Sequence, residues 1–341
     1  MNIKSLLLGS AAALAAVSGA QAADAIVAAE PEPMEYVRVC DAFGKGYFYI
    51  PGTETCLKIG GYVRFQLNWD DTDPDNWDAR TRGLVNFETK SDTEYGALGS
   101  FIAIRTWAEE DSAASSVEID EAYLTLGGFK AGYFYNLWDV GLSGETDNLG
   151  SDRINSVGYT YKGETVSAAF FVDELSKRYS EGAVGNPNLY GNDGVGIEGQ
   201  ISGTFGVVSA TLLGGYDFHV NDGSIRAIVS AAIGPGTFSV AGIWSSGANA
   251  YYDVSEWTVA AEYAAKLNDK FSITPGFQYW DSIDYDGSTG DFSGGDAWRA
   301  GVTLDYKITD GLTSKASVQY TDSDNSDDGV WSGYVRLQRS F

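Results

Sequence analysis

The chain has 341 residues, of which 20% are charged, and a formal net charge of −25 at pH 7. So large a negative charge repels phosphate groups, which excludes a nucleic-acid-binding protein. After residue 22 no apolar run approaches the roughly 20 residues that a membrane-spanning helix requires. If the protein spans a membrane, it must therefore do so with β-strands.

The first 22 residues have the features of an export signal. Lys4 supplies the positive charge, residues 6–17 are apolar, and residues 20–22 (Ala-Gln-Ala) form a small-residue cleavage site. The apolar stretch is too short for a membrane anchor. We therefore predict a mature protein that begins at Ala23, with 341 − 22 = 319 residues and, without Lys4, a net charge of −26.

Residues 23–56 contain the two cysteines of the chain, Cys40 and Cys56. Because exported proteins form disulfides, we predict that the two are bonded, which is worth roughly 3 kcal/mol by chain entropy. His219 is the only histidine, which leaves too few soft ligands for a metal site. We expect an N-terminal periplasmic segment at 23–56 and a transmembrane barrel at 57–341, with no metal and no cofactor.

Residues 57–69 alternate with the two-residue period of an amphipathic strand. Val63 and Phe65 lie on one face, and Lys58 and Arg64 lie on the other. A charge facing lipid at mid-membrane costs about 2–4 kcal/mol, so Lys58 and Arg64 must face an aqueous interior. The same alternation returns at 195–202, 256–266, 298–307 and 331–341, and is weaker at 94–107.

The connections between predicted strands fall into two length classes. Short turns are expected at 91–93, 127–128, 162–164, 204–206, 234–236, 268–269 and 309–311. Longer loops are expected at 70–79, 108–116, 136–152, 173–194, 217–223, 245–255, 281–296 and 322–329. Seven short and eight long connections join 16 strands, which predicts an all-β antiparallel transmembrane barrel with short periplasmic turns and long extracellular loops.

An exported β-sandwich or a solenoid fits the pattern less well. A sandwich would bury large aliphatic side chains on one face of every strand, whereas here the second face stays polar. A solenoid would show a repeat of fixed length, and the spacing is irregular. Closure into a barrel also removes the exposed edges that so many strands would otherwise have.

A barrel of this width cannot be filled by side chains, so its interior is expected to be an aqueous channel. The third long loop, 136–152, is acidic, and we predict that it folds inward against a basic wall, where a transverse field would orient small polar solutes. The acidic residues are Asp139, Glu145, Asp147 and Asp152, and the wall residues are Arg64, Arg80, Arg82 and Arg105. Alternatively, the loop lies outside and the arginines merely balance carboxylates in the lumen.

Residues 40–64, CDAFGKGYFYIPGTETCLKIGGYVR, resemble the amino-terminal signature of alphaproteobacterial porins, as do residues 30–33 and 36–39. The resemblance extends along the mature chain to the terminal Phe341. It implies a homotrimeric, 16-stranded general porin that crosses the Gram-negative outer membrane many times, with loop three folded into each pore. It also implies that the barrel-assembly machinery reads Phe341 and that the acidic loop faces the arginine wall.

We predict passive diffusion of ions and small hydrophilic solutes with weak cation selectivity. Acidic loops at the mouth raise the local cation concentration within about a Debye length, roughly 8 Å at physiological salt. They are also candidates for sharing divalent cations with lipopolysaccharide in the surrounding outer-membrane lipid. These clusters are Asp70, Asp71, Asp73, Asp75 and Asp78 in the first loop, and Asp322, Asp324, Asp327 and Asp328 in the last.

Two alternatives remain open. A sugar-selective channel would use an aromatic slide, for which Trp77, Trp107, Trp138 and Trp280 are available near the predicted loops. An anion-selective channel, for phosphate, would need a lining of many Lys or Arg, and the mature chain has only 21. A barrel enzyme would need a general base, and His219 beside Asp217 is the only histidine that could serve.

Overall fold

The computed structural model describes residues 38–72, 77–108, 115–176, 194–287 and 289–341. The predicted export signal, the start of the 23–56 segment, and Asp73 and Asp75 lie outside these described residues. Residues 39–341 form one compact unit, and the fold of this unit is described below. Within the described residues, no helix is both long and apolar enough to cross a membrane.

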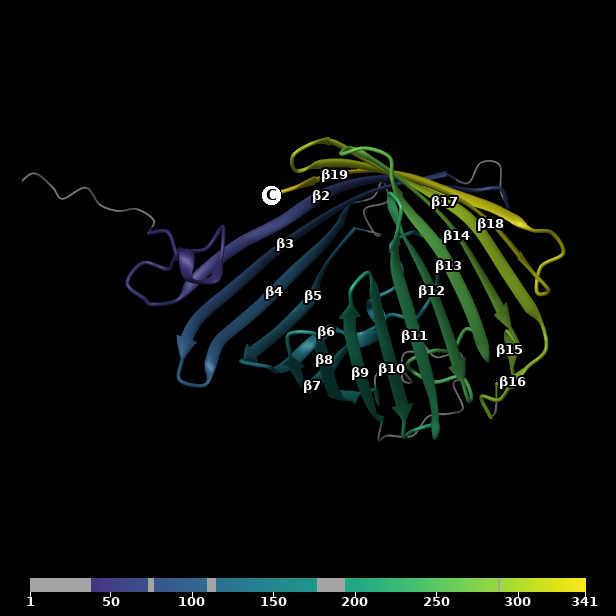
Figure 1. The fold of residues 1–341 in the computed structure, drawn as a ribbon, viewed down its shortest axis with the longest axis horizontal. Coiled ribbons are helices and arrows are strands. Elements are labelled where there is room, and N and C mark those ends of the chain that lie inside the picture. Colours follow the sequence, from purple (N-terminus) through teal and green to yellow (C-terminus); the bar gives the residue numbers. More distant parts are fainter. Residues whose placement is uncertain (1–37, 73–76, 109–114, 177–193, 288) are drawn as a thin grey trace, which may run out of the picture. The chain divides into compact units, whose positions relative to one another are not determined.

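Sixteen antiparallel strands close into one barrel (Figure 1), because each pairs with its neighbour in the chain and β19 returns to pair with β2. The strands are β2 (Cys56–Asp70), β3 (Trp77–Thr93), β4 (Gly96–Ala108), β5 (Ser116–Leu126), β6 (Phe129–Tyr135), β7 (Arg153–Lys162), β8 (Val166–Glu174), β9 (Val195–Phe205), β10 (Val208–Asp217), β11 (Asp222–Ile233), β12 (Gly236–Ser245), β13 (Trp257–Lys266), β14 (Phe271–Asp281), β17 (Asp296–Thr309), β18 (Leu312–Ser323) and β19 (Val330–Ser340). The predicted all-β antiparallel barrel is confirmed.

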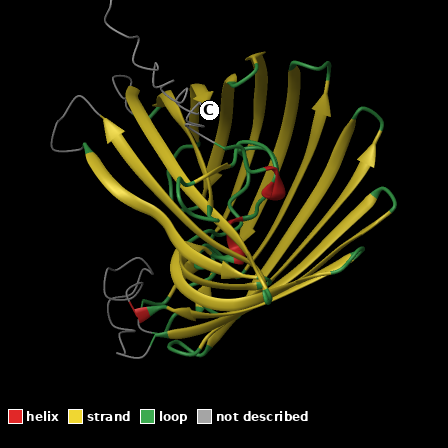
Figure 2. Cartoon of the chain, turned by 90° about the vertical axis from the view of Figure 1, so that its left-hand side faces the viewer, coloured by secondary structure: helices red, strands yellow, loops and turns green. Residues whose placement is uncertain are grey.

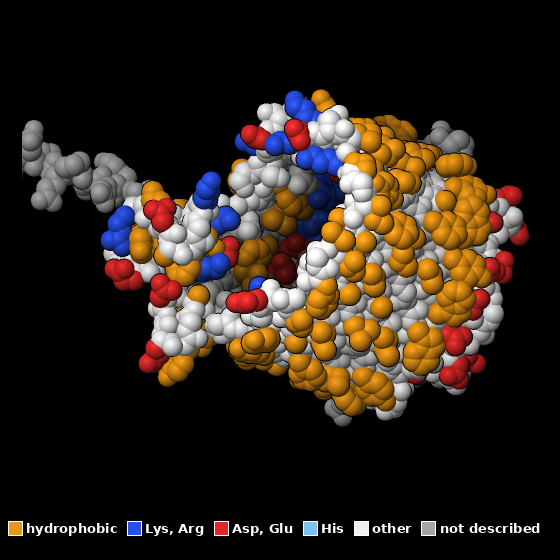
Figure 3. Space-filling model, viewed as in Figure 1, with side chains coloured by type: hydrophobic (Ala, Val, Ile, Leu, Met, Phe, Trp, Pro, Cys, Tyr) orange, Lys and Arg blue, Asp and Glu red, His pale blue; other side chains and the backbone are white. Residues whose placement is uncertain are grey.

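Alternation along each strand separates an apolar outer surface from a polar lumen. On β2 the side chains of Val63 and Phe65 are 53% and 45% exposed, whereas Arg64 between them is partly buried. Figure 3 shows hydrophobic side chains covering the outer wall, and Lys, Arg, Asp and Glu side chains inside the hollow. This distribution is that of a barrel with lipid outside and water inside.

The seven short turns are present, and one is displaced. β3 continues to Thr93, where it still pairs with β4, so the turn is 94–95 rather than 91–93. The loop predicted at 217–223 is wrong, because only residues 218–221 separate β10 from β11. There Asp217 accepts a hydrogen bond from the N–H of His219 (2.9 Å), and Asn221 takes a positive φ of 62°, which makes a tight polar hairpin. The connection after β14 contains a small hairpin of β15 (Asp284–Tyr285) and β16 (Phe292–Ser293).

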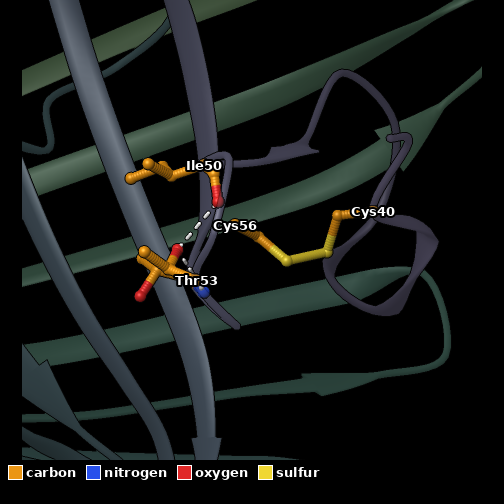
Figure 4. Close-up of a disulfide and its surroundings, with 5 residues drawn as sticks. Cys40, Ile50, Thr53 and Cys56 are labelled. Carbon is orange, nitrogen blue, oxygen red and sulfur yellow. Dashed lines mark hydrogen bonds between the residues drawn. A yellow bond between two sulfur atoms is a disulfide. The ribbon is translucent and has the colours of Figure 1, made fainter. Parts of the chain in front are cut away.

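The predicted disulfide is present, and it ties the segment before the barrel to the first barrel strand (Figure 4). Cys40 and Cys56 are 0% and 1% exposed, and the chain between them forms η1 (Asp41–Phe43) and β1 (Phe48–Tyr49), which pairs with β2. The Thr53 hydroxyl donates to the carbonyl of Ile50 (3.0 Å) in the turn that leads into Cys56. Covalent and hydrogen-bonded contacts together hold this segment against β2.

Candidate functional site

The loop 136–152, called L3 below, begins with η2 (Leu137–Asp139) and lies inside the barrel, as Figure 2 shows. Its backbone amides donate to side chains of the inner wall. The N–H groups of Ser143 and Gly144 donate to the two carboxylate oxygens of Glu262 on β13 (2.8 and 2.7 Å). Asn148 exchanges two hydrogen bonds with Gln278 on β14 (2.6 and 3.0 Å). Because these partners are almost completely buried, L3 is pinned to one side of the lumen.

A buried arginine holds both ends of L3. Arg226 on β11 is 1% exposed, and its guanidinium donates to the carbonyls of Leu137 (3.1 Å), Trp138 (2.6 Å) and Leu149 (2.9 Å). It also lies over the ring of Trp138, 5.1 Å from its centroid. The arginine therefore supplies hydrogen-bond donors to three loop carbonyls that would otherwise be buried without partners.

A second loop, residues 246–256 between β12 and β13 (L6 below), packs behind L3. The hydroxyl of Tyr251 donates to Asp173 on β8 (2.6 Å), and the Tyr251 ring lies 6.1 Å from that of Trp138. Tyr251 and Tyr252 belong to one buried hydrophobic cluster with Trp138 and Leu149. Burial in this position raises the pKa of both tyrosines. L3 therefore packs against a buried hydrophobic cluster on the side that faces L6.

The four predicted acidic residues of L3 have different environments. Asp139 is exposed and accepts from the Ser151 hydroxyl (2.6 Å). Asp152 closes the base of the loop, where its carbonyl accepts from the N–H of Asn136 (2.8 Å). Asp147 accepts from the N–H of Leu142 (3.2 Å).

Glu145 forms the ion pairs of L3 with the wall. It contacts Lys315 on β18 (2.7 Å) and, less closely, Arg336 on β19 (3.8 Å). Burial alone would raise the pKa of Glu145, but Lys315, Tyr334 and Arg336 together outweigh that effect, so its pKa lies below the ordinary value. Burial raises the pKa of Asp147, and the nearby carboxylates Glu262 and Glu145 act in the same direction. Of these two residues, Glu145 is the one whose ionised form is stabilised by its surroundings.

The four predicted arginines lie on β2, β3 and β4. Arg64 donates to the side-chain oxygen of Gln338 (2.8 Å), and Arg80 pairs with Asp78 (3.0 Å). Arg82 and Arg105 share Asp120, at 3.9 and 2.8 Å, and Arg105 also pairs with Glu118 (2.6 Å). The structure gathers these arginines on one wall, whereas the direct ion-pair partners of Glu145 are the neighbouring Lys315 and Arg336.

Sequence reasoning missed the residues that complete this arrangement. The inward side chains that hold L3 or balance the arginine wall are Glu118, Asp120, Arg153, Arg226, Glu262, Gln278, Lys315 and Arg336. Each lies on the polar face of a strand, which was a detectable signal. Their partners depend on strand register and on where L3 docks, which alternation alone does not reveal.

The tryptophans and the histidine named for the sugar channel and the enzyme are in environments that do not match those functions. Trp138 and Trp280 are 0% and 4% exposed, and Trp77 is 69% exposed, so these three do not form an aromatic slide along a lumen. His219 lies in the tight turn after β10. Among the described residues, no group of three or more His, Cys, Asp or Glu side chains is arranged to hold a metal ion.

The family model described as the porin subfamily matches residues 24–338. A putative outer membrane protein of Sinorhizobium fredii is 52% identical over 358 residues, covering 100% of this chain and 99% of the relative. Outer membrane protein IIIA of Rhizobium leguminosarum bv. viciae is 49% identical (98% and 93% covered), and porin Omp2b of Brucella abortus is 35% identical (100% and 100%). Among solved structures, the outer membrane channel DcaP of Acinetobacter baumannii shares the fold, with a TM-score of 0.66 at 12% identity over 86% of this chain and 99% of that one.

Proposed function

The chain belongs to the porin subfamily of the outer membrane, and on that premise we propose that it is a general diffusion channel for ions and small hydrophilic solutes, with weak cation selectivity. The observation that carries the proposal is the docking of L3 inside the barrel. Glu262, Gln278 and Arg226 hold the loop against one side, so the passage runs between L3 and the arginine wall.

Charge compensation in the wall supports the cation preference. Asp120 lies 2.8 Å from both Arg105 and Arg153, and Glu118 lies 2.6 Å from Arg105, so these carboxylates offset much of the positive charge. The acidic loops at the mouth then determine the preference for cations, and their effect on selectivity weakens as added salt shortens the Debye length.

Reversal potentials in a KCl gradient across planar bilayers test this proposal. Replacing Asp139, Glu145 and Asp147 by their amides should move the reversal potential toward anion selectivity. The matched control neutralises three carboxylates on short turns, Glu164, Asp269 and Asp310. If the control shifts the potential as far as the loop variant, L3 does not line the conducting path.

We extend the proposal to the setting of the channel. The precursor is cleaved after Ala22, the barrel-assembly machinery inserts the protein by way of Phe341, and three copies associate in outer-membrane lipid and lipopolysaccharide. A trimer seen by native mass spectrometry in mild detergent, with a mature mass that starts at Ala23, supports this extension. A monomer that keeps residues 1–22 contradicts it.

A further inference from the structure

The two strands that close the barrel carry the same short motif. Residues 62–66 of β2 read Tyr-Val-Arg-Phe-Gln, and residues 334–338 of β19 read Tyr-Val-Arg-Leu-Gln. In the antiparallel register Arg64 lies opposite Gln338, and Gln66 lies opposite Arg336. Since each strand presents the same residues to the other, a local twofold axis passes between the two motifs. Their Tyr, Arg and Gln side chains are partly buried, and the Val, Phe and Leu side chains between them are exposed on the outer face.

Each arginine is held by a neutral partner. The Nε of Arg64 donates to the side-chain oxygen of Gln338 (2.8 Å), and the Nε of Arg336 donates to that of Gln66 (2.6 Å). The amide fixes the guanidinium without cancelling its charge, and the terminal amino groups keep their donors, apart from the contact of one Arg336 amino group with Glu145 (3.8 Å). The rings of Tyr62 and Tyr334 lie beneath Arg64 and Arg336, at 4.9 and 4.4 Å from the guanidinium carbons, which orients the two planes further.

Arg64 and Arg336 have fewer or more distant carboxylate partners than Arg105 on the arginine wall. Arg105 has two carboxylate partners, at 2.6 and 2.8 Å. Arg336 has one, Glu145, at 3.8 Å, and that carboxylate is held more closely by Lys315. Within the part of the chain that the structure describes, no carboxylate lies within 4.0 Å of the Arg64 guanidinium.

We propose that Arg64 and Arg336 form a binding site for small dicarboxylates that pass through the pore, with one carboxylate on each guanidinium. Diagonal neighbours of this kind lie about 7–8 Å apart along the sheet, within reach of a short dianion when long side chains converge. Arginine forks bind carboxylates through paired charge-assisted hydrogen bonds. The second carboxylate competes with Glu145 for Arg336, which brings the ligand against the tip of L3.

This inference rests on the proposed channel function, and conductance tests both. The full-length protein is inserted into planar bilayers in about 0.1 M KCl, where the Debye length is roughly 10 Å. Succinate is then added at constant ionic strength and should reduce the current saturably. Acetate, which can occupy only half of the site, should need at least a tenfold higher concentration for the same block.

Three variants separate the site from the general charge of the lumen. Arg64→Gln and Gln338→Glu should each raise the half-blocking succinate concentration at least tenfold, the second by placing a carboxylate beside Arg64. The matched control is Arg299→Gln on β17, because Arg299 is also held by a neutral group, the Thr321 hydroxyl (2.9 Å), and also lies over a ring, that of Trp280. This control should change the blocking concentration by less than twofold.

Two results would overturn the site while leaving the channel intact: normal KCl conductance with succinate no better than acetate, or an Arg299→Gln effect as large as that of Arg64→Gln. A correctly folded wild-type protein that does not conduct at all would overturn the channel function, and the inference with it.

Discussion

Replacing Arg226 by methionine should release L3 from the barrel wall while leaving the barrel closed. The substitution keeps an unbranched, apolar stem and removes the donors to the carbonyls of Leu137, Trp138 and Leu149. Each carbonyl left buried without a partner costs about 1–3 kcal/mol, so three cost at least about 3 kcal/mol. That cost shifts the docked-to-released equilibrium of L3 by roughly two orders of magnitude. The strand pairing of β11 uses backbone groups and should persist.

Single-channel recording and proteolysis measure this release. A freed loop should make the current noisier and raise the mean conductance, and it should expose the bond after Glu145 to a glutamate-specific protease. Arg299→Met is the control, because Arg299 donates to Thr321 on β18 instead of to L3. Wild-type noise and protease resistance in Arg226→Met would show that the arginine does not hold the loop.

Three further predictions concern other parts of the chain. Reducing the wild-type protein should add two hydrogens to its mass, because Cys40 and Cys56 form one disulfide. Replacing both cysteines by serine should destabilise the N-terminal segment by roughly 3 kcal/mol in denaturant titration and leave the conductance unchanged. Deleting Phe341 should lower the amount of inserted barrel in outer-membrane fractions, and normal insertion would contradict its role as an assembly signal. Acidification should protonate Asp147 first, because its pKa is raised, and the protonated form favours docking of L3. The pKa of Glu145 is lowered, so its stabilising ion pair persists until the pH falls through that lower value. Reversal potentials should therefore show a decline in cation selectivity at a higher pH than the one at which current noise rises.

The strands could be predicted from sequence because alternation is a local property. The side chains of Val63, Arg64 and Phe65 report their environments one residue at a time, and the structure places them accordingly. Loop 136–152 was also bounded correctly, because its run of glycines and acids interrupts the alternation abruptly. The hairpin at 218–221 was misjudged, because Asp217, His219 and Asn221 have the composition of a loop but form a tight turn.

The interior could be predicted only in part, because it depends on contacts between distant segments. Arg226 looks like any other lumen arginine, yet it is buried beneath a loop about 80 residues away in the chain. Trp138 looks like a rim aromatic, yet it is completely buried in a cluster that includes Tyr251 and Tyr252 of L6. Register determines that Lys315 lies opposite Arg336, and together they give Glu145 its cation partners. None of these pairings has a local signature.

The two sides of the lumen have different physical tasks. Where L3 and L6 pack, buried groups such as Arg226 and Glu262 form hydrogen bonds with backbone atoms of L3. These bonds fix the loop, and they leave the two side chains unable to bind a solute. Across the passage, Arg64 and Arg336 are held by neutral amides and keep their charge available. A wall of fully paired arginines would be rigid but electrically weak, and a wall of unheld ones would be charged but mobile. Holding a guanidinium through its Nε with glutamine gives both order and charge to the site that we propose for a passing solute.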